Sequence, residues 1–128
     1  MIAGRVNRYL DATAPLVVRG PNHATATLGF TIDTGFDGSV CLPPEQVAAL
    51  QLVPLGTQLV ILGDGSEAEL AMYEAAVEWH GRLVLVPALE VEGGALLGMA
   101  LLHGSRMTMD IVENGPLQIE PLRGSAAS

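Results

Sequence analysis

Short apolar segments, separated at regular intervals by turn-forming residues, constrain the fold of this chain more than any other feature of its sequence. Such segments are typical of short strands in a protein made mainly of β-structure. We predict strands at residues 5–10, 16–19, 23–32, 39–42, 58–62, 68–79, 82–88, 106–112 and 117–122. The pattern therefore predicts an all-β barrel or sandwich.

Turn residues lie between these strands at 20–22, 63–66, 80–81 and 114–115. The strongest turn signal is Asn114 with Gly115, because both central residues of a tight two-residue hairpin need a positive φ. Two short helices are expected to interrupt the strands. One covers residues 44–50 and begins with a proline, and the other covers residues 96–103 and ends before Gly104.

The composition favours one folded domain. The chain has 128 residues, of which 49% are apolar and 16% charged, so it can bury a core and is too apolar to be disordered. We assign residues 1–122 to a single domain and residues 123–128 to a loose tail. The longest apolar run, 83–89, is too short to cross a bilayer, and residues 1–12 lack a sustained apolar segment. We expect a soluble protein that does not bind membranes.

Charge and cysteine content narrow the choice of partners and compartment. The net charge is −8, and the six basic residues are arginines scattered along the chain, which argues against binding to nucleic acid or to anionic membranes. Cys41 is the only cysteine, so no internal disulfide can form, as in proteins of a reducing cytoplasm. The three histidines lack metal-ligand spacing. We expect a cytoplasmic protein without a metal or cofactor.

The segment GFTIDTGFDGSV, residues 29–40, carries the chemistry. An apolar strand runs directly into Asp33, and burial of an unused charge there would cost free energy. A carboxylate at a strand end makes a good general base, and two such carboxylates side by side share one proton and supply an acid and a base together. Thr34 can brace the loop through its hydroxyl, and Gly35 allows another backbone to approach closely. Asp-Thr-Gly alone is a weak signal, because all three residues are common in turns.

Several segments in order raise this signal: IDTGFDGSVCLPPE at 32–45, LGDGS at 62–66, YEAAVEWHG at 73–81 and LLGMALLHGSRMTMDI at 96–111. Together they resemble a bacterial retropepsin-like aspartic protease, from the single-motif branch of the pepsin superfamily. The resemblance covers roughly residues 3–122 and implies a closed β-barrel of short strands with a flap hairpin and one or two short helices.

The resemblance also implies roles for individual residues. Asp33 would be the catalytic aspartate, with Thr34 and Gly35 completing a loop that locks against a second such loop. Asp37 would lie near the backbone of the substrate. The flap tip that closes over a bound peptide would consist of Gly63, Asp64, Gly65 and Ser66. Residues 96–98 would form the apolar strand behind the catalytic loop, leading into a helix at 99–102.

Two departures from the retroviral pattern stand out. That pattern has an arginine and then a polar residue after the glycine of the second motif, where this chain has Met99 and Ala100. The ion pair of that arginine with the residue at Asp37 cannot form here, so a dimer contact built on it cannot be carried over. Asp64 also adds negative charge to the expected flap.

The chain contains one Asp-Thr-Gly and no Asp-Ser-Gly, so a shared-proton pair requires Asp33 from a second subunit. Two-fold symmetry brings identical loops face to face, and we therefore expect a homodimeric endopeptidase acting on peptide or protein substrates. One alternative is a non-catalytic dimeric peptide-binding or scaffolding module of the same fold. A third is a β-barrel ligand binder in which Asp-Thr-Gly is accidental, and the ordered second motif argues against it.

Overall fold

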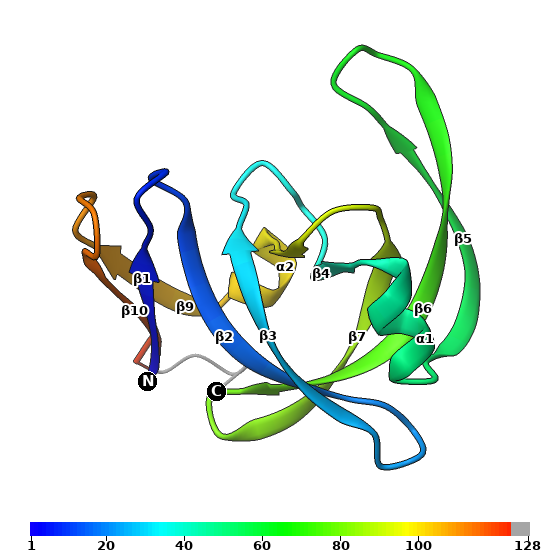
Figure 1. Cartoon of the computed structure of the whole chain (residues 1–128), viewed down its shortest axis with the longest axis horizontal. Coiled ribbons are helices and arrows are strands. Elements are labelled where there is room, and N and C mark those ends of the chain that lie inside the picture. The colour runs from blue at the N-terminus through cyan, green and yellow to red at the C-terminus, as the bar shows by residue number, and fades with distance from the viewer. Residues whose placement is uncertain (124–128) are drawn as a thin grey trace.

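A computed structural model describes residues 1–123 and shows a protein built mainly from strands (Figure 1). The described elements, in chain order, are β1 Ile2–Val6, β2 Ala12–Arg19, β3 Thr25–Ile32, β4 Val40–Leu42, α1 Pro44–Ala49, β5 Val53–Ile61, β6 Glu67–Trp79, β7 Arg82–Glu90, β8 Ala95–Leu97, α2 Met99–Leu102, β9 Ser105–Met109 and β10 Pro116–Pro121. The predicted all-β class with two short helices is confirmed. Of the predicted tail at 123–128, only Arg123 belongs to the described residues.

Six of the strands close a barrel. Following the hydrogen-bonded neighbours from β2 leads through β3, β8, β4, β7 and β6, and the pairing of β6 with β2 completes the ring. The remaining strands extend this sheet on two sides. On one side β1, β10 and β9 continue outward from β2, and on the other side β5 pairs only with β6.

The barrel interior is filled mainly by aliphatic side chains, as the low aromatic content requires. Phe30 and Trp79 are the aromatic members of the core cluster, and Phe30 is fully buried. Leu42 from β4, Val77 from β6 and Leu97 from β8 are also fully buried and come from three different barrel strands. The core therefore fixes the strand ends from which the loops at the top of Figure 1 emerge.

The β5–β6 hairpin projects from the barrel at the upper right of Figure 1. Its two strands pair in register from Val53 opposite Glu74 to Ile61 opposite Glu67, with a bulge between Pro54 and Gly56. Almost every residue of β5 is exposed, because this strand is the edge of the sheet and has no layer over either face. Edge strands accept proline, which explains how β5 begins before Pro54 rather than at residue 58 as predicted.

The first strand differs from the prediction, since β1 spans residues 2–6 and not 5–10. The side chain of Asn7 accepts hydrogen bonds from the backbone N–H groups of Tyr9 (2.9 Å) and Asp11 (3.0 Å), and Leu10 has a φ of 63°. An asparagine that bonds to the following backbone favours a turn over a strand. The chain therefore reverses at residues 7–11 and enters β2 at Ala12.

The tight hairpin predicted at Asn114 and Gly115 is wrong. β9 and β10 are joined by a six-residue loop, 110–115, in which Asn114 has a φ of 62° while Gly115 does not have a positive φ. Gly115 is required for another reason: an added Cβ would lie 1.8 Å from the backbone oxygen of Asp110. The two-residue turn occurs at His80 and Gly81, both with positive φ, between paired Trp79 and Arg82.

The second predicted helix begins later than its apolar pattern indicates. Residues 95–97 form β8, which pairs with β3 and β4, and α2 covers only Met99–Leu102. This division matches the strand and helix that the resemblance implied for the second motif. None of the helices within residues 1–123 has the length and apolar character needed to cross a membrane.

Candidate active site

Asp33 lies directly after β3, at the point where that strand leaves the barrel. Its backbone N–H donates to the carbonyl oxygen of Leu97 (2.9 Å), which continues the parallel pairing of β3 with β8. Its carboxylate oxygen Oδ1 accepts a hydrogen bond from the N–H of Gly35 (3.0 Å), and its carbonyl oxygen accepts one from Phe36 (3.1 Å). The side chain is half-buried, so it is held in place by the loop and still reaches solvent.

The loop after Asp33 is fastened to the segment between β8 and α2. The N–H of Gly98 donates to Ser39 (2.9 Å), that of Met99 to Phe36 (2.8 Å) and that of Ala100 to Gly38 (3.0 Å), in each case to the carbonyl oxygen. These contacts require glycine at position 98, because an added Cβ would lie 2.2 Å from the Gly38 oxygen. The two motifs quoted from the sequence therefore form one hydrogen-bonded unit.

Thr34 and Gly35 are exposed at the tip of this loop. Thr34 makes no hydrogen bond with any residue that the structure describes. It lines an apolar hollow of about 450 Å³ together with Met99, Leu102 and Met107. Because Met99 is itself 47% exposed, this face of the loop and of α2 presents apolar surface to the outside. The hollow contains no carboxylate.

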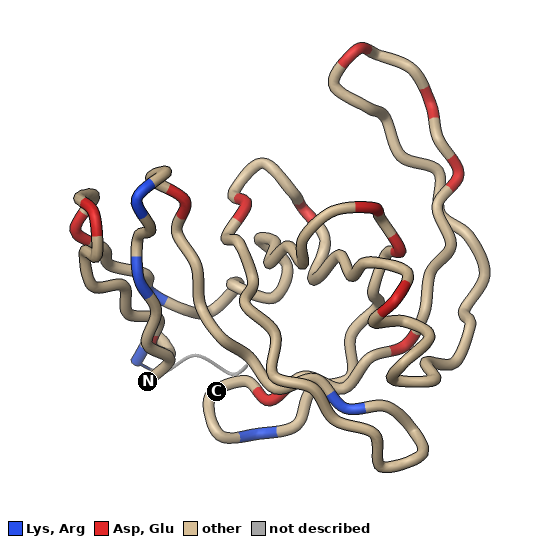
Figure 2. The backbone as a smooth tube through the Cα atoms, in the orientation of Figure 1, with Lys and Arg blue, Asp and Glu red and all other residues tan. Residues whose placement is uncertain are grey.

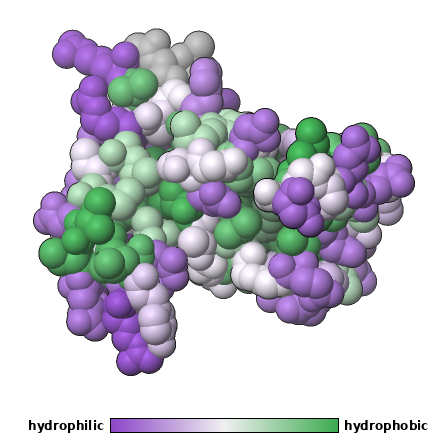
Figure 3. All heavy atoms as spheres, turned by 90° about the horizontal axis from the view of Figure 1, so that it is seen from above, coloured by the Kyte–Doolittle hydropathy of each residue, from purple (hydrophilic) through white to green (hydrophobic). Residues whose placement is uncertain are grey.

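A second hollow lies between the Asp33 loop and the β5–β6 hairpin, and its volume is about 440 Å³. We call it the hairpin cleft; its lining residues are Gly35, Phe36, Asp37, Gln58, Leu59, Val60, Ile61 and Leu89. Leu59 and Ile61 are 61% and 76% exposed, and in the view from above (Figure 3) hydrophobic side chains reach the surface at the hairpin end of the molecule, among hydrophilic ones. A volume of this size suits a small ligand or a short stretch of peptide.

The expected flap tip forms a turn at the end of the hairpin. Gly65 has a φ of 86°, which favours glycine, and the N–H of Leu62 donates to Ser66 across the turn (2.8 Å). Asp64 accepts hydrogen bonds from the Ser66 hydroxyl (2.5 Å) and the Ser66 N–H (2.9 Å), and these bonds lower the pKa of Asp64 below its ordinary value. The Asp64 carboxylate therefore stays ionised to a lower pH than an ordinary aspartate, and its hydrogen bonds to Ser66 stabilise the turn.

The structure brings some of the predicted residues together and keeps others apart. Gly35 and Asp37 line the hairpin cleft, whereas neither Asp33 nor the tip residues 63–66 are among its lining residues. Asp33 is joined to the cleft through its hydrogen bond to Gly35. Sequence reasoning missed the contributions of Phe36, of residues 58–61 and of Leu89. The exposed apolar side chains of β5 were the available signal, since a strand edge that presents leucine and isoleucine to solvent is unusual without a partner.

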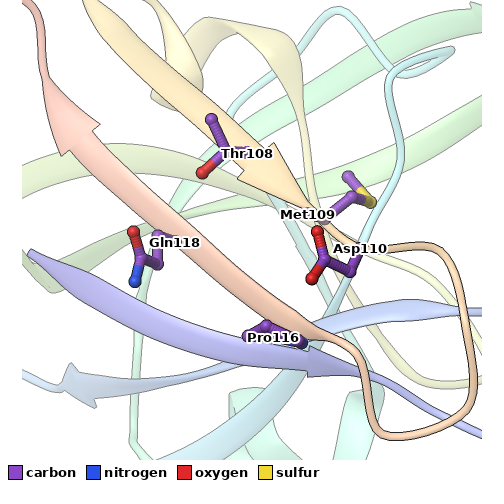
Figure 4. A pocket seen from close by; sticks show the side chains of 5 residues that line it. All are labelled: Thr108, Met109, Asp110, Pro116 and Gln118. Atoms are coloured by element: carbon purple, nitrogen blue, oxygen red, sulfur yellow. The ribbon is translucent and has the colours of Figure 1, made fainter.

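Another hollow, of about 250 Å³, lies far from this loop on β9 and β10 (Figure 4). Thr108 and Gln118 face each other across the two strands, and Asp110 stands at the end of β9 beside Met109 and Pro116. One carboxylate without a neighbouring base or nucleophile gives this hollow no chemistry. Within residues 1–123, no group of three or more His, Cys, Asp and Glu side chains is placed to hold a metal ion.

The histidines and the single cysteine stand outside the hairpin cleft. His80 shares a hydrogen bond between its Nε2 and the Ser105 hydroxyl (2.8 Å) and lies against the Trp79 ring. Cys41 is buried in β4 with 5% of its surface exposed. Burial, and to a smaller extent the nearby Asp33 carboxylate, raises the pKa of the Cys41 thiol to about 11.

Cys41 is therefore expected to resist alkylation. At pH 8 a thiol whose pKa is about 11 holds roughly a hundredfold less thiolate than an ordinary cysteine, and only the thiolate reacts quickly. Iodoacetamide at pH 8 should modify the folded protein at least about a hundredfold more slowly than the protein in urea, as followed by intact mass. Equal rates in both conditions would show that Cys41 is neither buried nor affected by Asp33.

The comparisons with known structures concern the fold. The crystal structure of a retropepsin-like aspartic protease from Rickettsia conorii superposes with a TM-score of 0.53 at 17% sequence identity, over 91% of this chain and 87% of that chain. The solution structure of the simian foamy virus (mac) protease superposes with a TM-score of 0.47 at 23% identity, over 69% of this chain and 90% of that chain. No protein-family model and no curated protein matches the sequence. The first of these superpositions confirms the fold predicted from the sequence.

Proposed function

Because this chain has the retropepsin-like fold, we propose that it is an aspartic endopeptidase that works as a homodimer. The observation that carries the proposal is the Asp33 loop: a carboxylate at a strand end, oriented by the Gly35 N–H, beside a cleft whose other wall is a projecting hairpin. A general base needs this combination of a fixed position and access to the substrate. The Rickettsia conorii structure, described as a retropepsin-like aspartic protease, supports the same reading.

The chemistry requires two copies of Asp33, one from each subunit. Like charges at close range do not both ionise, so the pair holds a single proton. The ionised Asp33 removes a proton from a water molecule, and the oxygen of that water attacks the carbonyl carbon of the peptide bond. The protonated Asp33 donates its proton to the carbonyl oxygen, which gives a neutral tetrahedral intermediate. Collapse of the intermediate, with a proton passing to the nitrogen, releases the two peptide products.

Thr34 is proposed to join the two loops. Its hydroxyl has no partner among residues 1–123, and it lies beside the apolar surface of Met99 and Met107. A second subunit seated there would give this hydroxyl a hydrogen-bond partner and would cover the apolar side chains. In a two-fold dimer each subunit would make both the hydrogen bond and the apolar contact, which favours a closed dimer.

The substrate is proposed to bind as an extended peptide in the hairpin cleft. Gly35 and Asp37 would contact it from the loop, and β5 would contact it from the hairpin. Residues Gly63, Asp64, Gly65 and Ser66 would form the tip that closes over the bound peptide. Extended peptides add their backbone to an exposed strand, with alternate side chains entering pockets.

Cleavage of a diverse peptide library by the wild-type protein, between about pH 4 and pH 7, tests the proposal. We expect new termini, identified by mass spectrometry, that do not form with the Asp33→Asn variant. Absence of cleavage across this range by a well-folded dimer would contradict general endopeptidase activity. A dimer that binds peptides without cleaving them would instead support the non-catalytic peptide-binding module.

A further inference from the structure

The hairpin cleft has a mixed polar and apolar surface, with five apolar residues and one charged side chain in its lining. Phe36, Leu59, Val60, Ile61 and Leu89 supply the apolar surface, while Gln58 and Gly35 are neutral. Asp37 is the only charged residue of the lining, and it is exposed. A single charged side chain beside apolar ones is the kind of contact by which pockets distinguish one ligand from another.

Asp37 has no partner within the described chain: residues 1–123 offer its carboxylate neither a hydrogen bond nor an ion pair. Two acidic residues on the hairpin differ from Asp37 in this respect. Asp64 accepts two hydrogen bonds from Ser66, and Glu69 accepts one from the Thr57 hydroxyl (3.0 Å). The Asp37 carboxylate is therefore open to a group that is not part of this subunit's described residues.

The elements around the hairpin cleft carry negative charge and no arginine (Figure 2). The Asp33 loop, the hairpin and the end of β7 contribute Asp33, Asp37, Asp64, Glu67, Glu69 and Glu90. None of the six arginines lines the cleft: Arg5 lies on β1, Arg8 in the turn at 7–11 over the Tyr9 ring, Arg19 at the end of β2 in an ion pair with Glu78 (2.6 Å), Arg82 at the start of β7, Arg106 on β9 and Arg123 after β10. A cleft bordered by charge of one sign attracts ligands of the opposite sign.

We propose that the hairpin cleft selects peptides with a lysine or arginine side chain, and that Asp37 is the residue that determines this specificity. This inference rests on the proposed function and deepens it by giving the class of substrate. The ammonium or guanidinium group pairs with the Asp37 carboxylate, while the aliphatic part of that side chain lies along the apolar wall formed by Phe36 and Leu89. Neighbouring apolar side chains of the peptide contact Leu59 and Ile61.

The test uses a positional-scanning peptide library, in which each position holds lysine, arginine, norleucine or glutamate in turn. Norleucine keeps the aliphatic chain and lacks the charge. Binding is measured by fluorescence anisotropy on the Asp33→Asn variant, which does not consume the peptide, and kcat/KM is measured on the wild type. At one position, lysine and arginine are expected to improve both quantities about five- to tenfold over norleucine, with less effect at 0.5 M salt.

Asp37→Asn is expected to reduce this preference to less than about twofold, whether it is introduced into the wild type or alongside Asp33→Asn. Asp110→Asn is the matched control, since it removes the same charge from an exposed position outside the hairpin cleft, and it should keep the preference. A preference that survives Asp37→Asn, an equal loss for charged and uncharged peptides, or no preference at any position would overturn the inference.

Failure of the proposed function gives a different result. If the wild type cleaves no peptide while the Asp33→Asn variant still prefers lysine through Asp37, the protein is a binding module and the specificity stands. If the wild type cleaves peptides without regard to charge, the protease stands and the specificity is wrong. Binding and cleavage are therefore read separately for each library.

Discussion

Replacement of Asp33 by asparagine is expected to reduce kcat for peptide cleavage by about 10³-fold or more, because an amide neither accepts a proton from water nor donates one to the carbonyl oxygen. Asparagine has nearly the same shape, and its side-chain oxygen can still accept the hydrogen bond from the Gly35 N–H. The folded structure should therefore persist. The measurement is initial cleavage rate together with the circular dichroism spectrum and the sedimentation coefficient of the variant.

Mixing the two proteins distinguishes a shared pair from one independent aspartate per subunit. If a dimer needs both copies of Asp33, then an equal mixture of wild type and Asp33→Asn, after exchange of subunits, retains about a quarter of the activity of the same total amount of wild type. If each subunit worked alone, half of the activity would remain. A linear dependence on the wild-type fraction would therefore exclude the proposed dyad even if the variant itself is inactive.

Gly98→Ala is expected to destabilise the protein by about 3 kcal/mol, equivalent to a fall in Tm of roughly 10 °C. The added Cβ would lie 2.2 Å from the Gly38 carbonyl oxygen and 2.5 Å from Cδ2 of the Phe36 ring. Because Gly98 is buried and hydrogen-bonded to Ser39, neither the loop nor the start of α2 can move aside without breaking backbone hydrogen bonds. Thermal unfolding followed by circular dichroism measures the effect.

Gly29→Ala provides the control for this substitution. Gly29 lies in β3, does not have a positive φ, and an added Cβ would meet nothing within 4 Å. The same change of residue should therefore alter the free energy of unfolding by less than about 1 kcal/mol, and the lower entropy of the unfolded chain acts in favour of alanine. Similar losses at both positions would show that the contact between the two motifs does not explain the requirement for glycine.

The sequence was sufficient for the class of fold and for the places where local chemistry decides the structure. The turn at residues 63–66 and the helix after Pro43 follow from residues that are near one another in the chain. The loop at 110–115 could not be predicted in this way, because its shape depends on hydrogen bonds between Val6 and residues 114 and 115, which are distant in sequence. The side chain of Asn7 was a local signal that was available and overlooked.

The candidate site also has a part that the sequence predicts and a part that it does not. Asp33, Thr34 and Gly35 could be selected from the sequence because their chemistry resides in three consecutive residues. Two other features depend on the closure of the barrel, which places β7 and β5 opposite the loop. These are the hydrogen bonds between the Asp33 loop and residues 98–100, and the lining of the hairpin cleft. No local pattern indicates that Leu89 approaches Phe36.

The length of β6 has a mechanical consequence for the hairpin. From Met72 to Trp79 this strand is bonded to β7, and near Val77 also to β2, whereas Glu67–Ala71 pair only with β5. The hairpin is thus anchored in the barrel at one end, from Met72 onward, and makes no strand pairing with the barrel at the other. The hairpin therefore cannot move as a lid hinged on flexible loops. Closure over a ligand must bend β6 within Glu67–Ala71. The bulge between Pro54 and Gly56 would then accommodate the change in length along β5. The same restoring force that such bending creates would reopen the hairpin and help to release what was held beneath it.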